Sequence, residues 1–367
     1  MIKLEVLLQE MPERNASDLF LKAGSQPMFR IDNVIEPSDF PELSVADVRN
    51  IAYSLMSEDQ IRFFEQHHEM DLAIGIRGIG RFRINIFMQR SSVGMVFRYI
   101  AHPNFTFEDL NLPLAVRSLS EKHRGLVLVT GTTGSGKSTT LAAMINHINS
   151  FRRCHVMTIE DPIEFLHQDN MAIINQREVG FDTKNFNEAL KHVLRQSPDV
   201  ILIGEMRDLE TIQTAISAAE TGHLVFSTLH TIDAVQTVER IINYFPAYLH
   251  PQIRLELSLC LNGVISMRLL PHATGKGRIP AVELMIGTPT IKKLLHEGKT
   301  LELPQHIAAG RQVGMQTFNQ ALYDLYVENK IKLEDALAYA TSPAEFRLMV
   351  EGIASGVQAK EMQRREE

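Results

Sequence analysis

Cysteine is scarce in this chain, which has only Cys154 and Cys260 among its 367 residues. Neither belongs to a Cys-x-x-Cys pair. A disulfide framework needs several paired cysteines, and a tetrathiolate zinc site needs four. The sequence therefore excludes both kinds of cross-link, and we expect a protein that works in a reducing compartment.

Long apolar runs are also missing. No stretch reaches the roughly 18 consecutive apolar residues of a candidate membrane-spanning helix. Residues 1–15 carry charges at Lys3, Glu5 and Glu10 among other positions, so they lack the apolar segment of a secretory signal. We therefore expect a cytoplasmic protein without an integral membrane segment.

Positive charge is not in excess, because 37 Lys and Arg residues stand against 44 Asp and Glu residues and the net charge is −7. Proteins that bind nucleic acid concentrate Lys and Arg, so we expect no nucleic-acid partner. Apolar residues, by contrast, make up 44% of the chain, enough for sizeable cores. The length favours two domains, followed by a charged tail over 356–367.

The N-terminal region, residues 1–100, has the pattern of a small α+β domain with short alternating strands and two helices. Ser44 with Asp47, and Ser57 with Gln60, have capping-box spacing, so a helix should begin after each serine.

A β-hairpin is predicted within this domain. Residues 71–76 and 81–88 alternate around a glycine-containing turn, and a further strand is expected over 93–100. Residues 101–116 contain prolines and show little periodicity, which is typical of a linker. The second domain would then occupy 117–355.

Beyond the linker, long apolar strands alternate with helices, the pattern of a parallel sheet covered on both faces. The strand 125–130 runs into a complete Gly-x-x-x-x-Gly-Lys-Ser motif and then into an apolar helix. In such a motif the backbone cradles phosphates, Lys137 bridges the terminal phosphates of ATP, and Ser138 is a ligand of Mg²⁺. The expected nucleotide-binding residues are Gly131, Thr132, Thr133, Gly134, Ser135, Gly136, Lys137, Ser138 and Thr139.

A second buried strand, 200–203, ends in Gly204 and Glu205. Ligands bind at the carboxyl ends of strands in α/β sheets, so Glu205 is placed to hold Mg²⁺ through water. Asp199 lies at the other end of this strand, and we expect it to cap the preceding helix.

A third strand, 155–159, is followed by Glu160, Asp161 and Glu164, so we expect three carboxylates at the same sheet edge. Hydrolysis of ATP needs a positioned proton acceptor, and one of these side chains should be the general base.

Histidines flank the strand 224–229. Because this strand follows the one that carries Glu205, we expect His230 to lie near the γ-phosphate and to sense or position it. For His223, functional and structural roles remain equally open. The spacing of the two histidines across a strand separates them, so no metal site is expected there.

Several blocks of this sequence resemble the PilT/PilU family of type IV pilus retraction ATPases, and the resemblance spans nearly the whole chain. In order, these blocks are GLVLVTGTTGSGKSTTLAAMIN (125–146), TIEDPIEF (158–165), INQREVG (174–180), GEMRDLETI (204–212) and AAETGHLVFSTLHT (218–231).

The resemblance implies an α/β fold: a RecA-like P-loop ATPase domain with a parallel-rich sheet and C-terminal helices, preceded by a PAS-like α+β N-terminal domain. It makes Glu164 the catalytic base and gives Glu205 and His230 their places in the Walker B and His boxes. It also implies that Arg83 and Arg98 reach the phosphates of the nucleotide. The implied assembly is a homohexamer, peripheral at the inner membrane, that acts on a platform protein there.

Departures from the family pattern bear on the subtype. The extra N-terminal domain and the cysteine-rich zinc insert of the assembly and secretion relatives are missing, which favours the retraction branch. Within that branch, an Ala-Ile-Arg-Asn-Leu-Ile-Arg-Glu helix is replaced by Thr-Ile-Lys-Lys-Leu-Leu-His-Glu at 290–297, without either arginine. Segments 314–318 and 342–349 look closer to PilU, so a primary motor and an accessory motor both remain open.

Two functions of different classes therefore remain. One is an enzyme whose ATP hydrolysis drives pilus retraction. The other is a nucleotide-gated adaptor that assembles with a second, PilT-like ATPase and hydrolyses little ATP itself. The complete set of candidate catalytic residues favours the enzyme.

Overall fold

The computed structural model describes residues 3–103 and 105–352. These residues form two compact units. The first contains residues 3–102 together with the short segment Glu164–Leu166, and the second contains the remainder. The charged tail expected over 356–367 lies outside the described residues.

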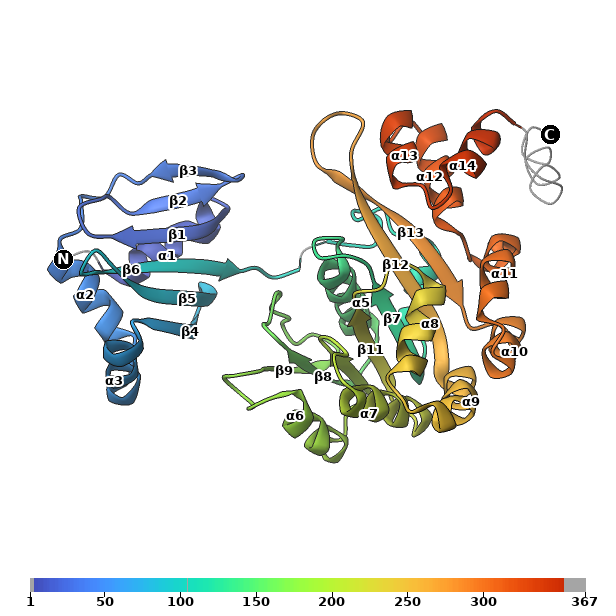
Figure 1. Cartoon of the computed structure of the whole chain (residues 1–367). Helices are drawn as coiled ribbons and strands as arrows, with labels where there is room; N and C mark the ends of the chain where they lie inside the picture. The colour runs from blue at the N-terminus through green and yellow to red at the C-terminus, as the bar shows by residue number, and fades with distance from the viewer. Residues whose placement is uncertain (1–2, 104, 353–367) are drawn as a thin grey trace. The chain divides into compact units, whose positions relative to one another are not determined.

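The first unit is a six-stranded antiparallel sheet, in the order β3-β2-β1-β6-β5-β4, with three helices (Figure 1). Alternate residues such as Phe82 and Ile84 of β5 are buried in its core. The strands are β1 (Ala16–Lys22), β2 (Met28–Ile31), β3 (Val34–Pro37), β4 (Glu69–Ile76), β5 (Gly80–Gln89) and β6 (Ser92–Ile100), and the helices are α1 (Leu4–Glu13), α2 (Val45–Ser54) and α3 (Glu58–His67).

The predicted hairpin β4–β5 and both predicted helix starts are confirmed, with complete capping boxes at Ser44 and Ser57. The expectation of two helices is wrong, because α1 also packs on the sheet through Leu7, Leu8 and Met11. No side chain caps the N-terminus of α1, so the sequence carried no start signal for it.

The second unit contains a seven-stranded sheet in the order β13-β12-β7-β11-β10-β8-β9. All its neighbouring strands are parallel except β13, which pairs antiparallel with β12. The strands are β7 (Gly125–Thr130), β8 (His155–Glu160), β9 (Ile173–Glu178), β10 (Val200–Ile203), β11 (Leu224–Leu229), β12 (Leu261–Pro271) and β13 (Arg278–Ile286). The predicted parallel-rich α/β sheet is thus confirmed.

Helices cover both faces of this sheet, which is why β7, β10 and β11 are buried along their whole length. One core lies under α4 (Leu114–Ser120) and α5 (Lys137–Phe151). The other lies under α6 (Phe186–Val193), α7 (Leu209–Glu220), α8 (Ala234–Asn243), α9 (His250–Cys260), α10 (Pro289–Glu297) and α11 (Leu303–Ala309).

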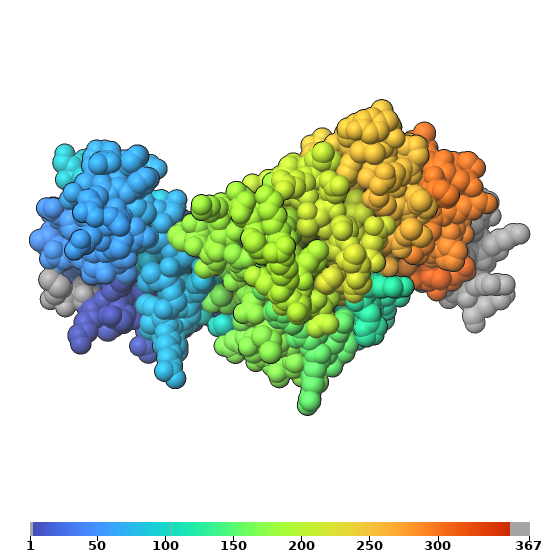
Figure 2. Space-filling model, turned by 90° about the horizontal axis from the view of Figure 1, so that it is seen from below, coloured from blue at the N-terminus to red at the C-terminus, as the bar shows by residue number. Residues whose placement is uncertain are grey.

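The C-terminal helices pack on the β12–β13 ribbon. They are α12 (Phe318–Val327), α13 (Leu333–Tyr339) and α14 (Pro343–Val350), and Phe318 and Phe346 are buried against Leu270 and Ile279 of the two strands. Figure 2 shows the orange segment around α10 and α11 directly against the yellow one around α8 and α9, as their contacts require.

Most of the segment expected to be a linker, 101–116, is part of the second unit. Phe107, Leu112 and Val116 are buried in the core under α4 and α5, and α4 already begins at Leu114. The prolines hid this packing, because they interrupt periodicity without preventing burial.

Candidate active site

The candidate site is built around the loop between β7 and α5, which lie as the motif predicts. Gly131, Gly134 and Gly136 have φ values of 138°, 76° and 98°, a region that favours glycine. A Cβ atom on Gly131 would lie 2.5 Å from the carbonyl oxygen of Met267, so a larger residue does not fit. These glycines let the backbone curl as a phosphate cradle requires.

Two side chains give this loop the chemistry of an anion site. The Lys137 ammonium donates hydrogen bonds of 2.9 Å to the carbonyl oxygens of Gly131 and Thr132. Ser135 Oγ is buried and has no hydrogen-bond partner within the described residues. A buried hydroxyl without a partner is costly, and a phosphate oxygen at the N-terminus of α5 would satisfy it.

A pocket of about 330 Å³ lies against the loop. Residues 131–135 form one wall, and the end of β12 and Tyr339 of α13 form much of the rest. Ser266 of β12 is opposite Thr130, the last residue of β7, so residues 267–269 extend past the end of β7 into this pocket.

Backbone hydrogen bonds fix Glu205 at the neighbouring strand ends. The Gly204 N–H donates to the carbonyl of Ile159 on β8 (2.8 Å), and the Met206 N–H donates to that of Thr228 on β11 (3.1 Å). Glu205 therefore projects from the carboxyl edge of the sheet, where the sequence predicted it.

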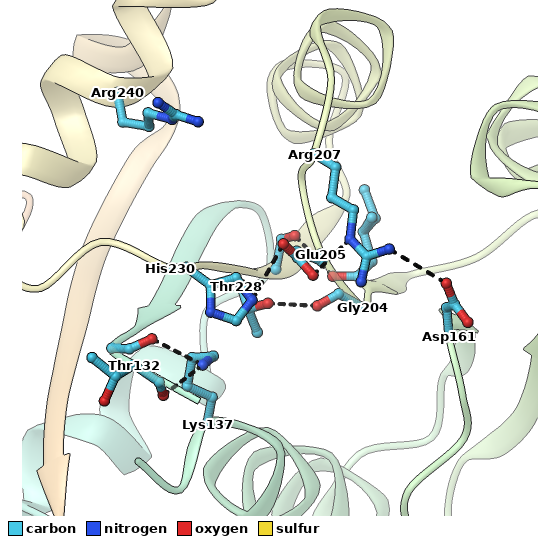
Figure 3. A network of polar contacts seen from close by, with 12 residues as sticks. Thr132, Lys137, Asp161, Gly204, Glu205, Arg207, Thr228, His230 and Arg240 are labelled. Carbon is cyan, nitrogen blue, oxygen red and sulfur yellow. Dashed lines mark hydrogen bonds and ion pairs between the residues drawn. The ribbon is translucent and has the colours of Figure 1, made fainter. Parts of the chain in front are cut away.

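Two side chains hold the Glu205 carboxylate from two sides (Figure 3). Its Oε1 lies 3.3 Å from Nε2 of His230, and its Oε2 accepts a 2.8 Å hydrogen bond from Nε of Arg207. Arg207 also lies 3.6 Å from Asp161 Oδ2. The hydrogen bond to Glu205 raises the pKa of Arg207. The network thus joins residues that follow β8, β10 and β11.

A cleft of about 690 Å³ opens beside this network. It is lined by Glu205, Arg207 and His230 and by α8, whose Arg240 lies over the Tyr244 ring with 5.0 Å between the guanidinium carbon and the ring centroid. Figure 3 shows Lys137 on the same side of Glu205 as His230. The structure therefore brings the loop, Glu205 and His230 together and leaves room for water beside them.

The carboxylates at the end of β8 and just after it have separate partners. Glu160 accepts hydrogen bonds from Thr158 Oγ1 (2.6 Å) and Gln176 Nε2 (3.1 Å), whereas Asp161 pairs with Arg207. Glu160 is thus held within the sheet, and Asp161 joins the Glu205 network.

Glu164 lies in the short segment that is grouped with the first unit. Within that unit the Leu166 N–H donates to the carbonyl of Ala101 (3.1 Å), and the His102 ring bonds to the Leu166 carbonyl (2.8 Å). Glu164 itself is exposed. Its role as the base stays a prediction.

Two residues lie at the opposite, amino end of the strands. Asp199 does not cap a helix as expected; its carboxylate accepts the N–H of His155 at the start of β8 (2.8 Å), because that N–H would otherwise lack a partner. His223 bonds through Nδ1 to the carbonyl of Ala218 (3.0 Å). This arrangement favours a structural role for His223.

Arg83 and Arg98 lie in the first unit, directly opposite each other on β5 and β6. Arg98 Nε bonds to Asp18 (3.0 Å), although the Arg98 side chain is 68% exposed. Within the described residues, the Arg83 side chain makes no hydrogen bond or ion pair. Like charges directly across strands are unfavourable, so an anion between the two arginines would stabilise them. Their role at the nucleotide stays a prediction.

Arg207 is the site residue that sequence reasoning missed. It lies in the block 204–212, but a single arginine is usually a solvated charge and received no role. One signal could have identified it. Arg207 comes two residues after Glu205, and the strand that they follow is a neighbour of the strand that ends next to Asp161.

A family model described as "Type II/IV secretion system protein" matches residues 2–362. The chain is 45% identical over 349 residues to the type IV pilus ATPase PilU of Pseudomonas aeruginosa, covering 95% of this chain and 91% of PilU. It is also 45% identical over 340 residues to PilT of that organism, covering 93% of this chain and 98% of PilT. A twitching motility protein of Neisseria gonorrhoeae is 43% identical over 330 residues, with 90% and 88% covered.

Solved structures give the same result. The crystal structure of the pilus retraction motor PilT with bound ADP is similar with a TM-score of 0.85 and 46% identity, covering 94% of this chain and 99% of that one. The ATPase DotB of Legionella pneumophila, with a TM-score of 0.75 and 23% identity over 95% of each chain, shares the fold.

Proposed function

Because the chain belongs to the Type II/IV secretion system protein family, we propose that it is an ATP-hydrolysing motor that drives type IV pilus retraction. The observation that carries this proposal is the glycine-rich loop with Lys137 in the same unit as the Glu205–His230 pair. Relatives named for retraction and twitching motility support pilus retraction as the work that is done.

The nucleotide binds at the loop. Lys137 exchanges its carbonyl partners for the terminal phosphates, Ser135 Oγ donates to a phosphate oxygen, and the N-terminus of α5 adds its positive end. The remaining loop residues, 131–134, Gly136 and Thr139, shape the cradle.

The donor set of the site fits Mg²⁺. In nucleotide sites this ion takes only one or two protein oxygens, because phosphates and water supply the others. Ser138 offers a hydroxyl and Glu205 a carboxylate, both oxygen donors that Mg²⁺ prefers. When bound, the ion neutralises charge on the phosphates. His230, which contacts Glu205, would fix the orientation of that carboxylate.

Glu164 is the proposed general base, and Arg83 and Arg98 are proposed to contact the phosphates from a homohexamer's subunit interfaces. The exposed carboxylate of Glu164, the guanidinium of Arg83, which is unpaired among the described residues, and the exposed Arg98 directly across from it support these roles.

The proposed location is the cytoplasm, at the inner membrane, where the hexamer would act on a platform protein. A second PilT-like ATPase would be a further partner. Among the described residues, none of the helices is both long and apolar enough to span a membrane. Contact with the membrane would then pass through the platform protein.

Measurement of phosphate release by the purified, assembled protein tests the enzymatic function. We expect steady turnover of ATP that depends on Mg²⁺. Tight ATP binding with no turnover would instead support the alternative, a nucleotide-gated adaptor that needs a partner motor.

A further inference from the structure

A cation lines the loop pocket. Arg268 lies on β12 two residues beyond Ser266, the partner of the last residue of β7, and borders the 330 Å³ pocket with residues 131–135. β12 is tightly fitted to the loop here, since a Cβ atom on Gly131 would lie 2.5 Å from the carbonyl oxygen of Met267. The position of Arg268 is thus coupled to that of the loop.

The Arg268 guanidinium is half-buried and has no carboxylate within ion-pair distance in the part of the chain that the structure describes. Asp233 and Glu283 act on it only at longer range, and burial lowers the pKa of Arg268. Arginine nevertheless keeps its proton in proteins. A half-buried charge without a counterion is unfavourable, so this guanidinium would gain from an anion in the pocket.

The same guanidinium holds the C-terminal helices. It stacks over the Phe318 ring of α12, 3.7 Å from the guanidinium carbon to the ring centroid, and donates a hydrogen bond to the Tyr339 carbonyl at the end of α13. A planar guanidinium can stack and donate several hydrogen bonds at once, which an ammonium cannot do. Arg268 is therefore a direct link between the loop pocket and α12–α14.

We propose that Arg268 binds phosphate charge of the nucleotide in the loop pocket and couples nucleotide binding to the docking of α12–α14 on the β12–β13 ribbon. The proposal rests on the proposed nucleotide site at Lys137. Such coupling is reciprocal: if nucleotide strengthens helix docking by some factor, docked helices strengthen nucleotide binding by the same factor.

The test uses the full-length protein, ADP as the ligand, and two measurements that need no turnover. The first is ADP affinity by calorimetry, and the second is hydrogen exchange of the α12–α14 amides with and without ADP. The variants are Arg268→Gln, which removes the charge, and Arg268→Lys, which keeps the charge but not the planar fork. Arg311→Gln is the control, because Arg311 pairs with Asp324 of α12 but does not line the loop pocket.

In the unmodified protein, ADP should slow exchange in α12–α14. Arg268→Gln should weaken ADP binding roughly tenfold to a hundredfold, the loss expected for a charged hydrogen bond, and abolish the ADP-dependent slowing. Arg268→Lys should lose less affinity but also lose the slowing. Arg311→Gln should speed exchange in both states while keeping the ADP affinity and the ADP-dependent difference.

Normal ADP affinity in Arg268→Gln, or an intact ADP-dependent difference in both Arg268 variants, would overturn the proposal and leave Arg268 a structural link only. If Arg268→Gln does not fold, the proposal is tested by Arg268→Lys alone, through the difference in α12–α14 hydrogen exchange with and without ADP. Failure of the unmodified protein to bind ADP would count against the proposed nucleotide site instead, so the two failures are distinguishable.

Discussion

Glu205 Oε1 lies 3.3 Å from Nε2 of His230, while the other carboxylate oxygen is bonded to Arg207. The carboxylate is thus fixed between two cationic or potentially cationic groups at the carboxyl edge of the sheet. A carboxylate held in this way is oriented for contact with a metal-bound water, but each of its oxygens already has a side-chain partner. Proton abstraction is therefore better assigned to the exposed Glu164 than to Glu205.

The first prediction is that these two carboxylates are needed for ATP turnover but not for nucleotide binding. Glu164→Gln should lower ATP turnover roughly a hundredfold to ten-thousandfold, the usual contribution of acid–base catalysis, with ADP affinity largely retained. Glu205→Gln should also lower turnover and retain ADP affinity, because it removes the carboxylate that orients the metal-bound water. Glu210→Gln on the exposed face of α7 is the matched control and should turn over normally. Wild-type turnover by Glu164→Gln would show that the base is assigned wrongly.

The second prediction concerns the loop lysine. Lys137→Ala should abolish ATP turnover and weaken ADP binding, because the ammonium neutralises the terminal phosphates. Its two carbonyl partners belong to the loop itself, so the fold should survive. Calorimetry with ADP and circular dichroism check both statements, with exposed Lys122→Ala as the control. Unchanged ADP affinity and turnover would contradict the assignment of the loop.

The sequence predicted the second unit better than the first. In the parallel sheet, β7, β10 and β11 are fully buried, so their apolar runs are unambiguous, and the residues after them must meet at one edge. That rule located Glu205 and His230 correctly. It could not supply the Arg207 contacts, because a side-chain pairing depends on rotamers that strand order does not determine.

Other errors have similar local causes. α1 was missed because it has no capping side chain and contains Pro12. Asp199 was assigned to a helix cap because the sequence does not reveal that the nearest unpaired N–H, that of His155, belongs to a neighbouring strand. Asp199 thus bonds to a residue far away in the chain, and α1 lacks the local signal that marks a helix start.

The third prediction is a pH dependence at Glu283 of β13. Desolvation raises the pKa of Glu283 to about 7, against the lowering effects of its bond to the Ala234 N–H and of Arg268. The folded state then holds a proton that the unfolded state has lost, so this group's contribution to stability falls as pH rises from about 4.5 to about 7. Each pKa unit corresponds to about 1.4 kcal/mol.

Glu283→Gln removes this titration but keeps an acceptor for Ala234. Relative to the unmodified protein, its free energy of unfolding should therefore increase between pH 5 and pH 8, as measured by urea denaturation. Exposed Glu334→Gln should show no such trend. A pH-independent difference for Glu283→Gln would mean that the Glu283 pKa is ordinary.

The fourth prediction is that hydrolysis requires assembly. Arg83→Ala and Arg98→Ala should each lower turnover by roughly a thousandfold or more, as for loss of an arginine finger. Arg83→Ala is the cleaner variant, because Arg98→Ala also removes the bond to Asp18. Exposed Arg77→Ala, in the hairpin turn, is the control.

Mixing inactive subunits makes this test sharper. If the arginines act across subunit interfaces, a mixture of Arg83→Ala and Lys137→Ala subunits should regain part of the turnover that each variant lacks alone. No recovery, or a turnover per subunit that stays constant on dilution to isolated subunits, would rule out catalysis at interfaces.

The last prediction concerns α10, where the family arginines are absent. Ile291, Leu294 and Leu295 are buried, so this helix packs on the core through an apolar side. Lys292 Nζ makes a single 3.2 Å hydrogen bond to the Leu259 carbonyl of α9, whereas His296 is exposed. An ammonium is a point charge and cannot make the bidentate contacts of a guanidinium. The helix therefore docks, but its polar face offers weaker contacts to a partner than one with two arginines.

We accordingly expect ATP hydrolysis by this protein but no strong retraction by it alone, with full force only beside a second, PilT-like ATPase. The measurement is pilus retraction force in a strain that lacks every other retraction ATPase. The double variant Lys292→Arg with His296→Arg should raise the retraction force of this protein alone without changing its ATP turnover. Lys293→Arg is the control and should leave the force unchanged, because Lys293 is exposed and its ammonium lies 3.8 Å from Glu297 on the same helix. Full-force retraction by the unmodified protein alone would make it a primary motor, because the missing arginines would then not limit the force.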